Sequence, residues 1–448
     1  MNARSLKIAI LAIVILGLAL TAAAAENKIE PKNLPSIDLR LQTFFLYRND
    51  ADFDRSKPLY DEYGQSVGYF ATIFEPTLDW QPIDQVTLRY GARIGENLWS
   101  RNDAEQNDPE DDSVQVLQHR EIWGQVMFNE AFGVRAGYQH IVDPTRLFVD
   151  RYMGAATMFY EMKKNKIEFT VGQFPDAVYE TTGAQTAAGE LQQNNFEQDI
   201  FLLALRGEFR SGYDVYFFPG FYALFDNSEI NREKTLFNPC LRLAYFFNHG
   251  TMIATDLAFQ WGTYKQSGPN NEDLDLMSGA AEVSAFVPIK RVSSYTDLLL
   301  LTSDDGDRND TLDTGYVYSG KSSSPTLLLT ENWLLDQYDN LDESAAAQRA
   351  GLFVASEQIT VHAAESLQVF GIFGYGTALD GDNLDDERTL GYEGDLGLSY
   401  HLYENHVRFT VLGGGLWPGG AAALLKNEID GKAKDPQYHG QANMQIHF

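Results

Sequence analysis

The segment Tyr438-His439-Gly440-Gln441-Ala442-Asn443-Met444-Gln445-Ile446-His447-Phe448 decides the fold of this chain. Side chains along a β-strand point alternately to its two faces. One face here carries Tyr438, Ala442, Met444, Ile446 and Phe448, and the other carries His439, Gln441, Asn443, Gln445 and His447. The first face suits an apolar medium and the second suits water. This pattern fits a strand in the wall of a membrane barrel, and the edge strand of a soluble sandwich is the alternative.

The beginning of the chain predicts a secretory signal peptide over residues 1–25. Arg4 and Lys7 precede an apolar run that ends at Leu20, and the small residues of 22–25 offer cleavage sites before Glu26. The apolar run is shorter than the roughly 20 residues that span a bilayer, which disfavours an anchor helix. We therefore expect export, with residues 26–448 forming the mature domain.

The composition narrows the class of protein. The formal net charge is -29, yet aromatic residues make up 13% of the chain, which is not the composition of a disordered protein. Such an acidic chain is an improbable partner for nucleic acid. Its single cysteine, Cys240, excludes an internal disulfide framework, and no haem attachment motif occurs. We expect no cofactor.

Alternation with a period of two recurs in about eighteen segments along the chain, each close to the length of a tilted membrane strand. The segments are 36–47, 68–80, 86–97, 114–128, 132–141, 153–162, 166–174, 196–209, 212–224, 236–247, 251–264, 277–288, 293–304, 346–360, 366–377, 389–402, 406–416 and 437–448. Short connections with turn residues alternate with longer ones. This layout predicts an all-β fold, a single antiparallel transmembrane barrel of about eighteen strands in the bacterial outer membrane, with short periplasmic turns and long extracellular loops.

The long loops hold much of the acidity, for example around Asp103–Asp112, Asp304–Asp313 and Asp380–Glu387. Carboxylate runs of this kind are able to bind Ca²⁺ and to bridge to anionic lipopolysaccharide. The spacing of a dedicated calcium loop is absent, so a solvated acidic surface is the stronger interpretation.

Assigning the apolar parity of each segment to lipid places charged residues in the lumen. The basic ones are Arg40, Arg89, Arg93, Arg135, Arg206, Arg242 and Arg408, and the acidic ones include Glu121, Glu168, Glu208, Asp256, Asp297, Glu393 and Asp395. The arginines concentrate in the first ten segments, and carboxylates dominate the rest. A wall of guanidinium groups guides anions because it compensates their lost hydration. Ordinary ion pairs that stiffen the wall are the alternative.

Two stretches carry a family resemblance. Phe132-Gly133-Val134-Arg135-Ala136-Gly137-Tyr138-Gln139, followed by Asp143-Pro144-Thr145-Arg146-Leu147, resembles the alginate export family of outer-membrane barrels, in which an Arg-bearing strand precedes a short Asp-x-x-Arg-Leu loop. Val407-Arg408-Phe409, leading to Leu416-Trp417-Pro418-Gly419-Gly420, is similar to that family's penultimate strand and loop. The resemblance implies a basic, constricted pore that passes polyuronate outward. The resemblance implies that Arg146 lines the pore together with Arg135 and Arg408. Tyr138 stands where the family usually has Arg.

The sequence therefore predicts an outer-membrane channel for anionic oligo- or polysaccharide, such as an alginate-like polyuronate, or for other small anionic solutes. A general diffusion porin, or a barrel that sheathes a larger envelope complex, is the alternative. No Gly-x-Ser-x-Gly nucleophile motif occurs, so we do not expect an enzyme. The expected partners are outer-membrane lipid and lipopolysaccharide, the barrel-assembly machinery, for which Phe448 is the assembly signal, and periplasmic export proteins.

Overall fold

The computed structural model describes residues 35–48, 67–94, 117–174, 200–212, 214–226, 234–264, 273–304, 312–313, 316, 324–326, 350–381, 384, 386–403, 406–427 and 435–447. In these ranges nearly every element is a strand, and one short helix, α4 (Gly420–Asn427), follows the penultimate strand. Within the described residues, no helix combines the length and apolarity needed to cross a membrane.

The long strands have lengths that suit a tilted crossing of the membrane. The first half of the chain forms β1 (Ser36–Arg48), β2 (Val67–Ile83), β3 (Val86–Ile94), β4 (Leu117–Met127), β5 (Phe132–Val142), β6 (Asp150–Met162), β7 (Asn165–Phe174), β8 (Ile200–Ser211) and β9 (Val215–Asp226). The second half forms β10 (Lys234–Phe246), β11 (Met252–Tyr264), β12 (Leu274–Ile289), β13 (Val292–Leu301), β14 (Leu312–Asp313), β15 (Leu352–His362), β16 (Leu367–Thr377), β17 (Thr389–Leu402), β18 (Val407–Pro418) and β19 (Gln437–His447).

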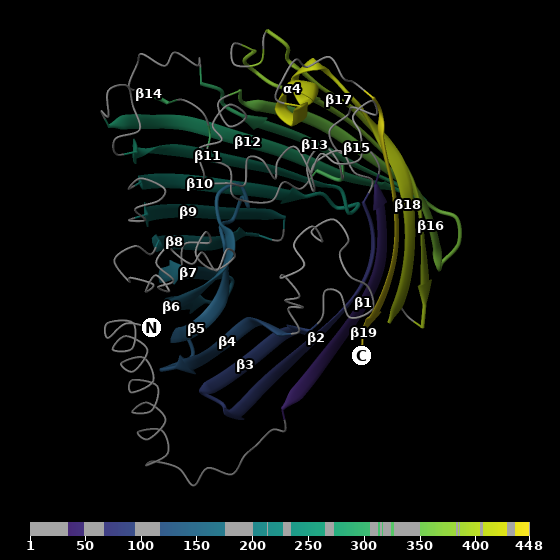
Figure 1. Ribbon diagram of the computed structural model, residues 1–448. Helices are drawn as coiled ribbons and strands as arrows, with labels where there is room; N and C mark the ends of the chain where they lie inside the picture. Colours follow the sequence, from purple (N-terminus) through teal and green to yellow (C-terminus); the bar gives the residue numbers. More distant parts are fainter. Residues whose placement is uncertain are drawn as a thin grey trace, which may run out of the picture.

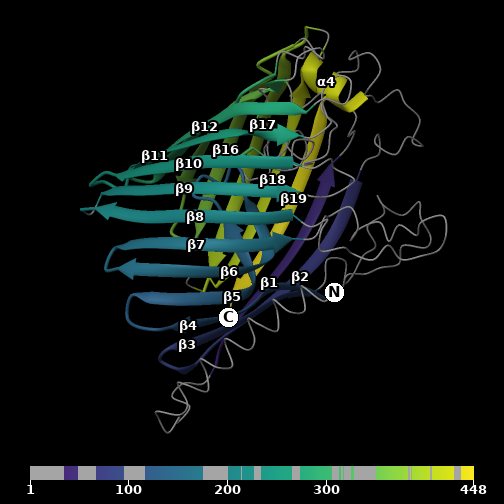
Figure 2. The ribbon, with the colours of Figure 1, turned by 90° about the vertical axis from the view of Figure 1, so that its left-hand side faces the viewer.

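The strands form one closed antiparallel barrel. Each long strand pairs with the next along the chain, β13 pairs with β15, and β19 pairs with β1 to close the ring. Figure 1 shows this closure, with the purple first strand beside the yellow last strand, and Figure 2 shows the wall from the side. The two-residue β14 lies parallel to β12 as an addition to the eighteen wall strands. The predicted fold class is therefore confirmed.

Short hairpins join the strands at the end of the barrel where β1 begins and β19 ends. At two of these hairpins Lys163 and Lys290 have φ angles of 50° and 56°. Positive φ at the first turn residue gives a backbone twist that matches the flanking strands of a tight hairpin. At a third hairpin the Asn129 side chain accepts the backbone N–H groups of Ala131 and Phe132 at 2.8 Å. The turn chemistry thus accounts for the predicted connections.

The wall has an apolar outer face and a polar inner face, as β11 illustrates. Leu257 is 46% exposed and Phe259 39%, whereas Asp256 and Gln260, which alternate with them, are fully buried from solvent. Predicted and observed segments agree to within four residues at each end, except that the segment predicted over 346–360 is observed as Leu352–His362. The final strand ends at His447, and Phe448, the expected assembly signal, lies outside the described residues.

One charged residue near the middle of a strand, Glu357, faces lipid, although lipid offers a charge no polar partner and such a residue is expected to face the lumen. Glu357 lies at the centre of β15 on the same face as Ile359, which is 50% exposed, and opposite the buried Ser356. Its carboxylate accepts hydrogen bonds from the hydroxyl groups of Ser294 and Thr296 on β13, the second at 2.5 Å. The sequence rule failed here because two hydroxyl donors on a neighbouring strand solvate the carboxylate in place of water.

Candidate functional site

The connection between β5 and β6, residues 143–149, forms the inward loop, and the Asp143 carboxylate holds it together. One oxygen of Asp143 accepts the backbone N–H and the hydroxyl of Thr145, at 2.8 and 2.5 Å. The other oxygen accepts the backbone N–H groups of Phe148 and Val149, at 2.9 and 2.7 Å. Burial raises the pKa of the Asp143 carboxyl, and these four hydrogen bonds oppose that shift.

The inward loop packs on the lumen side of the wall. Leu147 and Phe148 are fully buried, and the ring of Phe148 makes an edge contact with Tyr222 of β9, the centroids 6.4 Å apart. Arg206 of β8 donates a hydrogen bond to the carbonyl of Val142 at 2.9 Å. Because Tyr222 and Arg206 both face the lumen, the loop narrows the barrel from within.

Described parts of the connection between β13 and β15 also lie against the inner wall. The fully buried Tyr316 accepts a hydrogen bond from the side-chain amide of Asn238 on β10 at 3.2 Å. Ser324 exchanges a hydrogen bond with Ser356 of β15 at 3.0 Å. The interior therefore holds side chains from two connections as well as from the wall.

Most of the predicted arginine wall is ion-paired. Arg89 binds Asp79 with two hydrogen bonds of 2.7 and 2.8 Å and lies 3.5 Å from Glu121. The other pairs are Arg40–Glu75 at 3.4 Å, Arg93–Glu75 at 3.9 Å, Arg206–Glu168 at 2.5 Å and Arg242–Asp256 at 3.4 Å. Four of these five arginines pair with carboxylates of β2 and β7, and Arg242 pairs with Asp256 of β11, which weakens the expected transverse field. These contacts favour the wall-stiffening interpretation for the five paired arginines.

Of the eight arginines predicted to line the pore, three form no ion pair with the described residues: Arg135, Arg146 and Arg408. Arg135 on β5 donates hydrogen bonds to the Gln125 side chain at 2.9 and 3.2 Å, and its guanidinium lies 4.5 Å from the centre of the Trp123 ring. Arg408 on β18 donates to the hydroxyl of Ser399 at 3.0 Å. These contacts orient both guanidinium groups without neutralising them.

Arg146 lies within the inward loop and is exposed. Its φ of 61° is in the left-handed region, which costs an ordinary residue about 1 kcal/mol or more. The loop therefore presents a cation at the narrowed part of the barrel.

The predicted acidic wall is also present on the inner face. Glu168 contacts Lys166 at 2.9 Å as well as Arg206, and Asp256 contacts Arg242. Glu393 and Asp395 lie close together on β17, and Oδ1 of Asp395 lies 2.7 Å from Nε2 of His439 on β19. Sequence reasoning missed His439, although its place on the polar face of the last strand put it in the lumen.

The class of protein that these features define is an outer-membrane β-barrel. Eighteen strands enclose an interior wide enough for an aqueous channel, and the charged inner face and apolar outer face match a wall between water and lipid.

Comparison with solved structures identifies similar barrels. OccK8 (OprE) of Pseudomonas aeruginosa superposes with a TM-score of 0.55 at 10% identity, covering 92% of this chain and 98% of that one. A BenF-like porin of Pseudomonas fluorescens Pf-5 gives 0.56 at 10%, covering 94% and 100%. OpdQ of Pseudomonas aeruginosa gives 0.56 at 8%, covering 93% and 99%. At such identities the likeness concerns the fold.

No family model and no curated protein matches the chain. The three barrels above are Occ, Opd and BenF-like proteins, so the comparisons give no specific support for the alginate export family. The resemblance of residues 132–147 and 407–420 to that family stays a prediction.

Proposed function

We propose that this barrel is a porin-type channel for small solutes with a preference for anions. One of the similar structures is described as a porin, and its barrel is matched over its whole length. The observation that carries the proposed preference is the set Arg135, Arg146 and Arg408, three lumen-side guanidinium groups that form no ion pair with a described carboxylate. Passage of solute, and not catalysis, is the role that this arrangement suits.

The inward loop is the natural place for selection. It narrows the lumen, and it carries Arg146 at an exposed position in a strained backbone conformation. Arg135, on the strand that leads into the loop, adds a second guanidinium that its contacts with Gln125 and Trp123 hold in place. The guanidinium groups donate hydrogen bonds that replace the water molecules an anion loses as it passes through the pore.

The candidate functions differ in the size of the solute that passes through the pore. Small carboxylates and sugar acids suit a barrel narrowed from within, and an alginate-like polyuronate is the larger candidate that the sequence resemblance implies. The many neutral ion pairs of the wall favour the remaining alternative, an unselective diffusion pore. Contact with lipopolysaccharide, assembly by the barrel-assembly machinery and recruitment of periplasmic export proteins stay predictions.

Planar-bilayer conductance of the refolded protein tests the proposal. Reversal potentials in a salt gradient should show anion preference, and changing Arg135→Gln together with Arg146→Gln should move them toward cation selectivity. In a water-filled pore, a guanidinium about 4 Å from a bound anion contributes about 1 kcal/mol to its binding. Removing one such charge should therefore lower the affinity for the anion about fivefold.

The matched control is the pair of changes Asp79→Asn and Arg89→Gln, which removes an ion pair but no net charge. It should leave selectivity unchanged. If an oligouronate blocks the ion current and its monomer does not, the solute is a polysaccharide. If the monomer blocks the current, the solutes are small. Unchanged selectivity in the Arg135 and Arg146 variant would leave the unselective pore as the function.

A further inference from the structure

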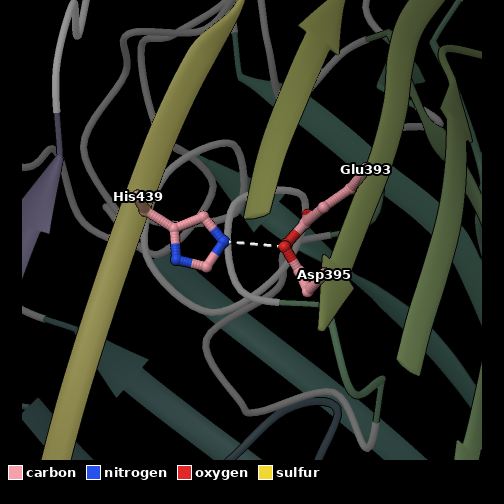
Figure 3. Close-up of side chains that lie close together, drawn as sticks. All are labelled: Glu393, Asp395 and His439. Atoms are coloured by element: carbon pink, nitrogen blue, oxygen red, sulfur yellow. Dashed lines mark hydrogen bonds and ion pairs between the residues drawn. The ribbon is translucent and has the colours of Figure 1, made fainter. Parts of the chain in front are cut away.

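A cluster of two carboxylates and one imidazole lies in the inner wall formed by β17, β18 and β19. Glu393 and Asp395 come from β17, and His439 comes from β19, with β18 between them. Figure 3 shows the three side chains converging, with Nε2 of His439 2.7 Å from Oδ1 of Asp395. Each residue offers one ligand atom, and these atoms all lie within 4.8 Å of one another.

Gly414 on β18 makes this convergence possible. The register aligns Asp395 with Gly414 and Gly414 with His439, so two strand spacings, about 10 Å, separate the outer backbones. A Cβ atom at position 414 would lie 1.9 Å from Oδ1 of Asp395. Only glycine leaves the space above the middle strand through which the two side chains meet.

The cluster is buried and has unused ligand atoms. The side chains of Asp395 and His439 are 0% and 2% exposed. Among the described residues, neither Oδ2 of Asp395 nor Nδ1 of His439 has a hydrogen-bond partner, and the same holds for both amide atoms of Gln437, which precedes His439 on the same face of β19. A buried polar atom without a partner destabilises the folded protein, so these atoms are suited to bind a ligand.

The contact between His439 and Asp395 leaves Oδ2 of Asp395 and Nδ1 of His439 without a hydrogen-bond partner. His439 reaches one oxygen of Asp395, and no described lysine or arginine forms an ion pair with either residue. Two carboxylates and an imidazole nitrogen are a donor set for a first-row divalent ion. Zn²⁺ bonds of about 2.0–2.1 Å place tetrahedral ligand atoms about 3.4 Å apart, which small side-chain rotations achieve from the present spacing.

We propose that Glu393, Asp395 and His439 bind a divalent transition-metal ion in the lumen wall, with Zn²⁺ the ion that suits them best. Three protein ligands leave a fourth position for water or for the amide oxygen of Gln437. The ion ties β17 to β19 across the glycine of β18, in addition to the backbone ladders. This site is independent of the proposed channel selectivity, because it lies apart from Arg135 and Arg146 and does not require passage of any solute.

Metal content of the refolded full-length barrel in detergent tests the site. After equilibrium dialysis against Zn²⁺ and removal of free ion, the protein should retain one equivalent, and Zn²⁺ should raise its unfolding temperature relative to EDTA. Asp395→Asn and His439→Gln should each weaken Zn²⁺ binding by at least tenfold. Asp256→Asn removes another fully buried lumen carboxylate outside the cluster and should leave Zn²⁺ binding intact.

A measurement on the unaltered chain keeps the test decisive if a variant does not fold. Co²⁺ should bind in competition with Zn²⁺ and give the visible absorption of a low-coordinate site with a nitrogen ligand. Equal retention of Zn²⁺ by the wild type and both cluster variants would overturn the proposal. So would a Co²⁺ spectrum of the hexaaqua type, or binding of Mg²⁺ and Ca²⁺ as tight as that of Zn²⁺.

Discussion

At the scale of single residues, Asp143 organises the narrowing of the barrel. Its two oxygens accept four hydrogen bonds within seven consecutive residues, 143–149, and turn a connection between strands into a compact loop that packs inward. The sequence shows the Asp-Pro-Thr-Arg-Leu motif, but it does not show that this loop packs into the lumen. That direction depends on buried contacts with β8 and β9, which are distant in the chain.

We expect Asp143→Asn to loosen the inward loop. The amide keeps one acceptor oxygen and turns the other position into a donor that faces backbone N–H groups, so the free energy of unfolding should fall by about 1–3 kcal/mol. Urea unfolding in detergent measures this loss, and single-channel recordings should show larger and noisier conductance. Asp84→Asn in an exposed periplasmic turn is the control and should change neither quantity.

The alternation along each strand indicates which residues share a face, but it does not indicate which side chains form pairs. Parity alone placed Arg89, Arg135 and Asp256 inside, since the strand period is two. Which arginine meets which carboxylate depends on register between strands, and the Asp395–His439 contact depends on a glycine between them. Neither the pairing register nor this contact follows from the sequence of a single strand.

At the scale of elements, β13 and β15 hold a carboxylate against lipid. Glu357 lies midway along its strand, and the hydroxyl groups of Ser294 and Thr296 donate hydrogen bonds to its carboxylate. Lipid-facing charge at mid-membrane costs up to about 2–4 kcal/mol for a basic residue and less for an acidic one. The pair of strands therefore tolerates Glu357 at a net cost to stability.

We expect Glu357→Leu to stabilise the barrel by about 1–2 kcal/mol, because it removes a charge from the lipid face. Ser294→Ala with Thr296→Ala should instead destabilise it by about 1–3 kcal/mol, since the carboxylate then lacks donors. Guanidinium unfolding in lipid vesicles, followed by tryptophan fluorescence, measures both changes. Thr255→Ala, an outward hydroxyl on β11, serves as the control. A destabilised Glu357→Leu variant would show that the carboxylate has a favourable partner in the membrane.

At the scale of the whole molecule, closure of the sheet removes every free edge from the hydrocarbon. The strand count, the hairpin positions and the antiparallel order followed from the sequence because alternation and turn residues are local signals. Helix α4 and the parallel β14 did not, because both lie in connections where local periodicity is weak.

Closure predicts resistance to mild denaturation. The unheated protein should migrate as a compact species in detergent gels and shift to slower or otherwise altered mobility after boiling, with a circular dichroism spectrum dominated by β-structure. Identical mobility before and after boiling would contradict a closed barrel. A refolding reaction stopped before completion provides the control for the open form.

The pairing of β1 with β19 also sets the order of events in folding. Its register joins Arg40 to His447, nearly the two ends of the described chain. The ring is unable to close before the last strand has crossed the inner membrane, and contacts between such distant residues form slowly because the chain entropy of a very large loop is lost first. Until then the exposed strand edges attract other chains. The last hairpin to be synthesised thus determines how long the polypeptide must be kept soluble in the periplasm.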